Sequence, residues 1–182
     1  NRHDYALAPF SKTALDSLKD AGLDVIGVGK IPDIFVYQGI TRKIKTVSNE
    51  DGMNKTIELA SDNFNGLAFI NLVDFDAVYG HRRNAAGYGK AIEEFDVQLG
   101  ELINELKNDD LLMVTADHGN DPTYRGTDHT REQVPLIIYS KQFNEMKVLN
   151  DGDSFGIIGS TICDNFNVKY NGIGSSILEL LK

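Results

Sequence analysis

The sequence has 182 residues, which suits one ordinary domain, or a domain with a small appendage, and leaves too little chain for two full domains. With 18 Lys and Arg against 27 Asp and Glu, the net charge is −9, which argues against nucleic acid and anionic membrane as partners. A hydrophobic content of 41% excludes intrinsic disorder, and no apolar run approaches the length of a membrane span, so a soluble protein is predicted. The single cysteine, Cys163, cannot form an internal disulfide and fits a cytoplasmic location.

The first part of the chain alternates between predicted helices and strands. Residues 1–9 lack periodicity and are expected to be a leader or hinge. Ser11 is expected to cap a helix that ends at Gly22, and residues 24–29 are short and β-branched, as in a strand. Residues 31–46 carry helix breakers and are assigned to a loop with room for a short edge strand. Ser48 and Asp51 resemble a capping box for a helix reaching Ala60.

The remaining segments predict a parallel α/β sheet. Residues 66–73 are apolar nearly throughout, as expected of a central strand covered on both faces. A helix is predicted over residues 86–106, strands over 111–115 and 134–139, and helices over 154–166 and 175–181. The apolar stripe of the longest helix comprises Ile92, Phe95, Leu99, Leu102 and Leu106. Strands separated by helices indicate a mostly parallel sheet with helices on both faces.

Three of the four histidines lie in loops that are rich in aspartate, and His3 stands apart from them. Asp76 and His81 follow the strand predicted to end at residue 73, and Asp117 and His118 follow the strand predicted to end at residue 115. His129 precedes the strand over residues 134–139, and Lys30 follows the strand over 24–29. Loops at the carboxyl ends of parallel strands meet at one edge, so these side chains are expected to converge.

The chemistry of this set favours divalent metal. Carboxylate and imidazole without thiolate suit Mn²⁺, Zn²⁺ or Mg²⁺. The candidate ligands are Asp76, His81, Asp117, His118 and His129. They are too many for one catalytic ion and one short of two complete sites. Two ions would suit phosphoryl transfer, since they clamp the attacking and leaving oxygens and attract an anionic substrate to an acidic edge.

Other interpretations stay open at this stage. The same loops would also arise from helix caps and loop hydrogen bonds. Asp74 and Asp128 are either partners that orient an imidazole or solvated carboxylates. Four arginines, Arg82, Arg83, Arg125 and Arg131, are either phosphate-binding or surface and ion-pair residues. No activated nucleophile stands in a strained elbow, so a metal-binding regulatory or interaction domain without catalysis is a second functional hypothesis.

Three stretches together resemble the phosphopentomutases of the alkaline phosphatase superfamily. They are V-D-F-D-A-V-Y-G-H-R-R-N (residues 73–84), V-T-A-D-H-G-N-D-P (114–122) and G-T-D-H-T-R-E-Q-V-P-L-I-I-Y-S (126–140). The resemblance implies an alkaline-phosphatase-like core and an isomerase that interconverts the 1- and 5-phosphates of ribose or 2-deoxyribose with two Mn²⁺ ions. Phosphoglycerate mutases and phosphatases of the superfamily share A-D-H-G-N and are the nearest alternatives.

The resemblance also implies roles for particular residues and indicates which part of the family the chain matches. It implies that Asp76, His81 and His129 hold one manganese, that Asp117 and His118 help to hold the other, and that Lys30 contacts a substrate phosphate. The chain starts at Asn1 without an initiator Met and resembles the carboxyl-terminal half of the family. Residues 1–10 are therefore expected to be a hinge or the end of a cap domain, and residues 11–182 the second half of the metal-binding core. With the phosphorylated threonine expected elsewhere, this half alone is expected to be inactive.

Overall fold

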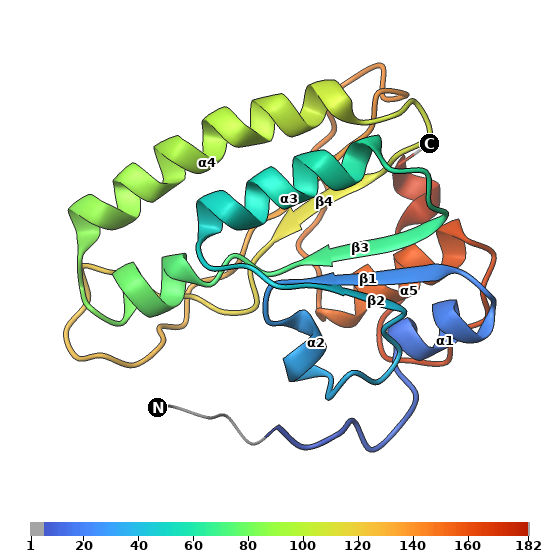
Figure 1. The fold of residues 1–182 in the computed structure, drawn as a ribbon, viewed down its shortest axis with the longest axis horizontal. Coiled ribbons are helices and arrows are strands. Elements are labelled where there is room, and N and C mark those ends of the chain that lie inside the picture. The colour runs from blue at the N-terminus through green and yellow to red at the C-terminus, as the bar shows by residue number, and fades with distance from the viewer. Residues whose placement is uncertain (1–5, 182) are drawn as a thin grey trace. The chain divides into compact units, whose positions relative to one another are not determined.

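A three-stranded parallel sheet organises the first of two units in the computed structural model, which describes residues 6–181. This unit comprises the chain up to Lys45, Phe64–Ile70 and the chain from Phe143 onward. Its strands are β1 (Asp24–Val28), β2 (Arg42–Ile44) and β3 (Gly66–Ile70). They lie in the order β2-β1-β3 with both pairings parallel, and Ile26 is in register with Arg42 and Ala68 (Figure 1). The predicted mostly parallel α/β class is confirmed.

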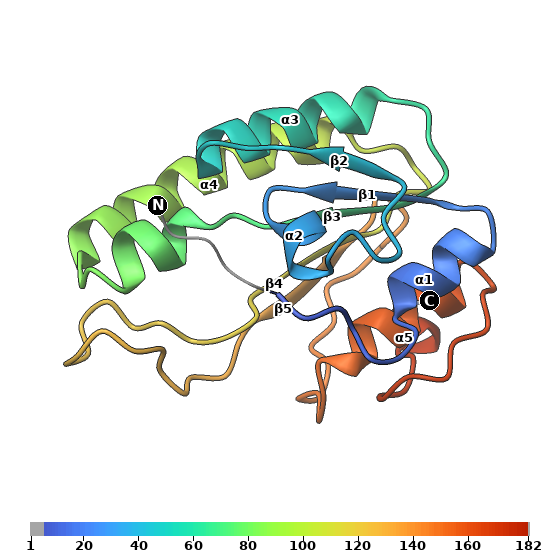
Figure 2. The same cartoon turned by 60° about the horizontal axis from the view of Figure 1, so that its bottom comes forward.

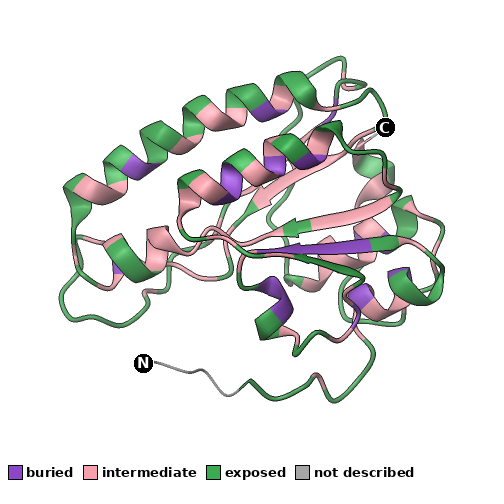
Figure 3. Ribbon diagram, viewed as in Figure 1, coloured by how far each residue is buried: buried purple, intermediate pink, exposed green. Residues whose placement is uncertain are grey.

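The middle of this sheet is β1. Val25, Ile26 and Val28 are at most 1% exposed, so side chains on both faces of the strand are buried, as its colour in Figure 3 shows. The prediction that residues 66–73 form the central strand is wrong for the described sheet, because β3 ends at Ile70 and pairs only with β1 there. A run of apolar residues reports that the faces of a strand are covered and does not report how many strands flank it.

Helices α1 (Ala14–Asp20) and α5 (Gly156–Asn165) supply the core of this unit. They lie side by side in Figure 2, and Leu15 and Leu18 pack with Val25 and Cys163 in one buried cluster. Burial of the Cys163 thiol raises its pKa. Such a thiol behaves as a small core hydrophobe, as predicted.

The start of α1 differs from the prediction by two residues. Thr13, and not Ser11, caps the helix: its hydroxyl accepts from the Asp16 amide, and the Asp16 carboxylate accepts from the Thr13 amide at 2.7 Å. Burial acts to raise the pKa of Asp16, but hydrogen bonds from Thr13 and Gln38 outweigh it, and the pKa lies below its usual value. A reciprocal box satisfies two orphan groups at once, which explains why the helix starts here.

The segment predicted as loop holds two short elements. One is the expected edge strand β2, and the other is a helical turn, α2 (Ile31–Ile34), with Pro32 in its first turn. Proline is tolerated there because the first helical N–H groups have no partner within the helix. The turn packs closely on β1, since a Cβ at Gly27 would lie 2.9 Å from the Pro32 side chain. The predicted terminal helix is reduced to a 3₁₀ turn, η2 (Leu178–Leu181).

The second unit comprises Thr46–Asn63 and Asn71–Gln142. Its helices α3 (Asn49–Ser61) and α4 (Ala85–Glu105) run alongside each other (Figure 1). Ser48 caps α3 as predicted, whereas the Asp51 carboxylate accepts from the Val47 amide, one residue before the expected position. Ile92 was expected in the apolar stripe of α4 but is 49% exposed, and Ala91 is buried instead.

The second unit also contains a strand pair, β4 (Leu112–Thr115) and β5 (Leu136–Tyr139), which are antiparallel. These strands were predicted where they occur, but a parallel arrangement was expected for them. Their 20-residue connection contains no helix to carry the chain back for a parallel pairing, so the chain returns directly. Within residues 6–181, the structure has no helix with the length and apolar character needed to cross a membrane.

Candidate metal centre

Asp76 and His81 sit at the two ends of a short π-helical segment, η1 (Phe75–Gly80). In an α-helix, residues five apart point roughly 140° away from each other. Here the His81 amide donates to the Asp76 carbonyl at 2.9 Å, an i→i+5 bond that stacks the two residues. His81 Nε2 consequently lies 3.3 Å from Asp76 Oδ2.

His129 reaches the same place from the connection between β4 and β5, which lies beside η1 in Figure 1. The antiparallel register pairs Thr115 with Leu136, so the segment that enters β5 lies at the end where β4 finishes. The segments also pair beyond the strands, where the Thr130 amide donates to the Gly119 carbonyl at 2.9 Å. A Cβ at Gly119 would lie 2.8 Å from the Thr130 carbonyl oxygen, so this close approach requires glycine.

Asp76, His81 and His129 form one cluster whose ligand atoms all lie within 4.8 Å of one another. His129 Nε2 is 3.3 Å from Asp76 Oδ1 and 3.2 Å from His81 Nε2. Ligands bound at about 2.1 Å to a tetrahedral or octahedral ion are separated by roughly 3.0–3.4 Å. The two Nε2 atoms are spaced as ligands of one divalent ion, with a different Asp76 oxygen facing each of them, and the predicted proximity of His129 and Asp76 is confirmed.

The orientation of His81 is also suited to a metal. His81 Nδ1 lies 2.5 Å from the Thr127 carbonyl oxygen. A carbonyl oxygen only accepts, so Nδ1 carries the proton and a neutral ring turns the lone pair of Nε2 toward the cluster. A carbonyl partner of this kind fixes the tautomer of a ligating histidine. Nε2 of both histidines and the Asp76 carboxylate thus face one point, where a cation would meet all three groups.

Sequence reasoning missed Asn120, which holds the carboxylate of the cluster. Its Nδ2 donates to Asp76 Oδ1 at 2.6 Å, and its Oδ1 accepts from Arg83 Nη1 at 2.7 Å. The motif A-D-H-G-N offered a signal, but nothing in its spacing showed that the amide would reach back to η1. Arg83 was weighed as a phosphate or surface residue, and the structure directs its guanidinium to backbone carbonyls and Asn120 instead.

Asp117 and His118 do not join the cluster. The Asp117 side chain is 78% exposed and its Oδ2 lies 3.6 Å from His118 Nε2. The His118 ring stacks on the His129 ring, with centroids 3.6 Å apart and planes inclined by 19°. His118 therefore packs against one face of a cluster residue, and its own role as a ligand stays a prediction.

The other predicted residues have separate positions. Lys30 belongs to the first unit, where its carbonyl accepts from the Asp33 and Ile34 amides at the start of α2. Asp74 exchanges hydrogen bonds with Asn49 at the start of α3, so it does not orient an imidazole. The backbone carbonyl of Asp128 accepts a hydrogen bond from Arg83 Nη2. His3 lies outside the described residues.

Two pKa shifts concern groups next to the cluster. Hydrogen bonds from the Thr123 hydroxyl and amide, both at 2.7 Å, hold the pKa of Asp121 below its usual value. Burial, with the charge of Asp76, raises the pKa of Tyr88. The Tyr88 ring lies against Phe75, with centroids 5.6 Å apart, so this protonated phenol supports the start of η1 from the side.

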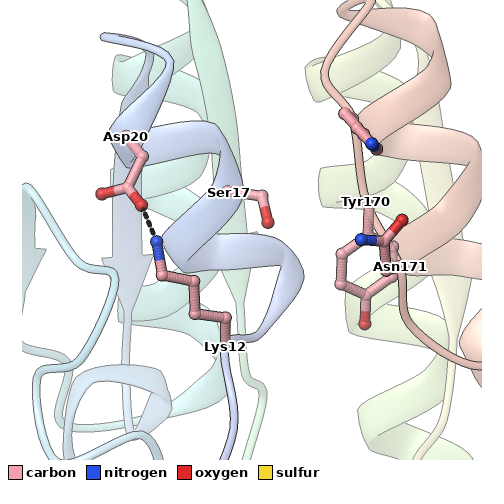
Figure 4. Close-up of a pocket in the computed structure, with 6 residues that line it drawn as sticks. Lys12, Ser17, Asp20, Tyr170 and Asn171 are labelled. Carbon is pink, nitrogen blue, oxygen red and sulfur yellow. Dashed lines mark hydrogen bonds and ion pairs between the residues drawn. The ribbon is translucent and has the colours of Figure 1, made fainter.

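A separate open pocket lies in the first unit, between α1 and the segment after α5 (Figure 4). It is lined by Lys12, Ser17, Asp20, Lys169, Tyr170 and Asn171. The Lys12 ammonium donates to Asp20 at 2.6 Å and does not point across the pocket toward Tyr170. Both side chains of this ion pair are more than half exposed, so the Lys12 charge is already paired at the surface.

Comparison with known proteins identifies the family of this chain. The model of the metalloenzyme superfamily matches residues 1–170. The chain belongs to the metalloenzyme superfamily. Within this superfamily, the chain is 57% identical over 183 aligned residues to phosphopentomutases of Agathobacter rectalis and of Clostridium botulinum. Each alignment covers 100% of the chain and 46% of the relative, so the chain spans about half the length of these curated relatives.

Solved structures of two more distant proteins share the fold. A Leishmania mexicana phosphoglycerate mutase, solved at low cobalt concentration, matches with a TM-score of 0.66 and 16% identity over 92% of this chain and 39% of its own. A Pyrococcus horikoshii protein matches with a TM-score of 0.54 and 19% identity over 68% of this chain and 34% of its own. At these identities the likeness concerns the fold, and it agrees with the predicted alkaline-phosphatase-like core.

Proposed function

We propose that this chain is the metal-binding part of a phosphopentomutase, an isomerase that interconverts the 1- and 5-phosphates of ribose or 2-deoxyribose. The observation that carries the proposal is the 57% identity to phosphopentomutases along the entire chain. The phosphoglycerate mutase alternative has weaker support, since it rests on a fold likeness at 16% identity. The substrate is accordingly a pentose phosphate.

Asp76, His81 and His129 are the proposed ligands of one divalent ion. Each histidine Nε2 lies 3.3 Å from a different oxygen of the Asp76 carboxylate, and the two Nε2 atoms lie 3.2 Å apart, which supports the assignment. Asp117 and His118 are the proposed contribution of this chain to a second ion. The chemistry of the donors, carboxylate and imidazole, is compatible with Mn²⁺ and with other divalent ions. Bound there, two such ions supply positive charge to the phosphoryl group as it transfers.

The residues of the chain itself prepare the site. The Thr127 carbonyl holds His81 with its Nε2 toward the cluster, and Asn120 holds the Asp76 carboxylate. Lys30 is the proposed contact for a substrate phosphate, for which its ammonium is a suitable point charge. The chain has no activated nucleophile among its predicted site residues, so the proposed activity belongs to the longer enzyme and the chain alone is expected to be inactive. A cytoplasmic location is proposed from the buried, unpaired Cys163.

The test compares substrates in the full-length protein. Conversion of ribose 1-phosphate to ribose 5-phosphate is measured with Mn²⁺ and a sugar bisphosphate primer, beside an assay with 3-phosphoglycerate. Activity on the pentose phosphate that is lost in Asp76→Asn supports the proposal. Activity on 3-phosphoglycerate alone would indicate the mutase alternative, and Mn²⁺ binding without either activity would indicate the regulatory-domain hypothesis.

A further inference from the structure

Arg83 joins the two segments that carry the metal cluster. Its Nη1 donates to the Gly80 carbonyl at the end of η1, at 3.1 Å. Its Nε and Nη2 donate, each at 2.5 Å, to the Gly126 and Asp128 carbonyls, next to His129. One planar guanidinium therefore bridges the segment of Asp76 and His81 to that of His129.

The backbone of Arg83 adopts a strained conformation between these contacts. Its φ is 53°, in the left-handed region that costs a non-glycine residue energy. The Asn84 amide donates to the Tyr79 carbonyl at 3.0 Å, a second i→i+5 bond that carries the wide turn past Gly80. Strain of this kind persists where the surroundings hold it in place, and here the carbonyl contacts of the side chain do so.

From Arg83 a directional relay runs to the cluster. A guanidinium can only donate, so the amide of Asn120 must turn its oxygen to Arg83 Nη1, at 2.7 Å. This leaves the Asn120 nitrogen to donate to Asp76 Oδ1 at 2.6 Å. Each bond polarises the next, since one end of the chain is a cation and the other a carboxylate. The Asp76 carboxylate is thereby held with one oxygen toward each histidine.

We propose that Arg83 and Asn120 are positioning residues that set the orientation of Asp76 and, through it, the divalent-metal affinity of the Asp76–His81–His129 cluster. The inference rests on the metal-binding role proposed above for that cluster. It adds a specific requirement for arginine at position 83. A lysine keeps the charge but offers three donors from a single nitrogen, so it cannot replace the five hydrogen bonds that the guanidinium makes to Asn120 and to the carbonyls of both segments.

The experiment measures Mn²⁺ affinity of the full-length protein by titration calorimetry, with no substrate present. Arg83→Lys and Asn120→Leu are compared with the double variant and with the wild type. Each single variant is expected to weaken Mn²⁺ binding 10- to 100-fold, the effect usual for partners that orient a ligand. Because Arg83 holds Asn120, and Asn120 holds Asp76, the loss of affinity in the double variant should fall short of the product of the two single losses. Multiplying losses would overturn the relay.

Arg82→Lys is the matched control. Arg82 is the neighbouring arginine and is exposed; within residues 6–181 its side chain makes one long contact, from Nε to the Ala77 carbonyl at 3.4 Å. Mn²⁺ affinity in this variant should stay within about twofold of wild type. Melting of the metal-free proteins separates positioning from general damage. Asn120→Leu is expected to lose affinity with little change in metal-free melting temperature, and an unchanged affinity would overturn the proposal.

The outcomes also distinguish this inference from the proposed function. Wild-type protein that binds Mn²⁺ and isomerises pentose phosphate, with Asn120→Leu binding as tightly as wild type, would overturn the relay and leave the function standing. Weakened binding in Asn120→Leu without pentose phosphate activity in wild type would support the relay and overturn the function. If Asp76→Asn binds Mn²⁺ as tightly as the wild type does, both the inference and the proposed metal-binding function would be overturned.

Discussion

Replacing Gly80 with alanine tests the cluster through the backbone. A Cβ at Gly80 would lie 2.4 Å from Asn120 Nδ2 and 2.6 Å from its Cγ. To reach an ordinary contact of 3.4 Å the Asn120 amide must retreat by about 1 Å, and a displacement of that size along its 2.6 Å bond to Asp76 would lengthen the bond to about 3.6 Å and break it. A hydrogen bond to a charged group is worth about 1.5–3 kcal/mol, so Mn²⁺ affinity should fall roughly 10- to 100-fold.

This test is informative because the helix propensity of alanine would by itself stabilise the protein, whereas the contact with Asn120 weakens metal binding. Gly80 does not have a positive φ, so alanine suits its backbone, and a helical Gly→Ala change alone stabilises by up to about 1 kcal/mol. Gly89→Ala in α4 is the matched control, because a Cβ there meets no atom within 4 Å. Calorimetric titration of both variants with Mn²⁺ should show weakened binding for Gly80→Ala alone. Equal affinities would refute the argument that Asn120 must stay in contact with Asp76.

Three further predictions concern other sites. Asp16→Ala should lower the free energy of unfolding by about 1 kcal/mol at pH 7, because the α1 capping box is lost. The pKa of Asp16 is lowered in the folded state, so the difference between variant and wild type should shrink as pH falls below about 4. Urea unfolding of both proteins at pH 7 and pH 3 measures this difference. Thr161→Val should lower the free energy of unfolding by about 1–3 kcal/mol, with a drop in Tm of roughly 2–4 °C per kcal/mol. The reason is that the buried Thr161 hydroxyl donates to the Ile157 carbonyl at 2.6 Å and accepts from the Ile177 amide at 3.0 Å. Thr161→Ser keeps both bonds, and an equal loss of stability in this control would contradict the explanation. Asp117→Asn should abolish pentose phosphate isomerisation in the full-length enzyme with an unchanged Tm, because the side chain is 78% exposed; retained activity at saturating Mn²⁺ would count against a ligand role.

The cluster was predictable because its signals are local in sequence. Asp76 and His81 flank one turn, and His129 stands beside an aspartate in the segment that enters a strand. Carboxylate and imidazole are ligands that suit divalent cations, and three loops at strand ends carry both, so residue type and position pointed to the same chemistry. The fold class was predictable for a similar reason, since alternation of strands and helices favours a parallel sheet, as β1, β2 and β3 form.

The details that complete the cluster depend on contacts that no spacing rule reports. A wide turn needs i→i+5 hydrogen bonds from His81 and Asn84, and an amphipathic pattern does not distinguish this turn from an α-helical one. Asn120 and Arg83 act across more than 35 residues of sequence, so their partnership appears only when η1 and the β4–β5 connection meet. The start of α1 shifted because Thr13 forms a reciprocal box with Asp16 and therefore caps the helix better than Ser11.

The antiparallel strand pair explains why the prediction for His129 succeeded although one of its premises was wrong. In a wholly parallel sheet, a residue that precedes a strand lies at the opposite edge from residues that follow strands, and His129 would have been remote from His118. Because β5 runs antiparallel to β4, its entrance lies at the end where β4 finishes, and the two histidine rings stack. The contacts that hold the triad, from the turn at Asp76 to the bridge at Gly119 and the fork of Arg83, all lie within residues 71–142 of the second unit. A site held by its own unit in this way is preorganised, so its affinity for a cation should depend on this local network of hydrogen bonds more than on any single ligand distance.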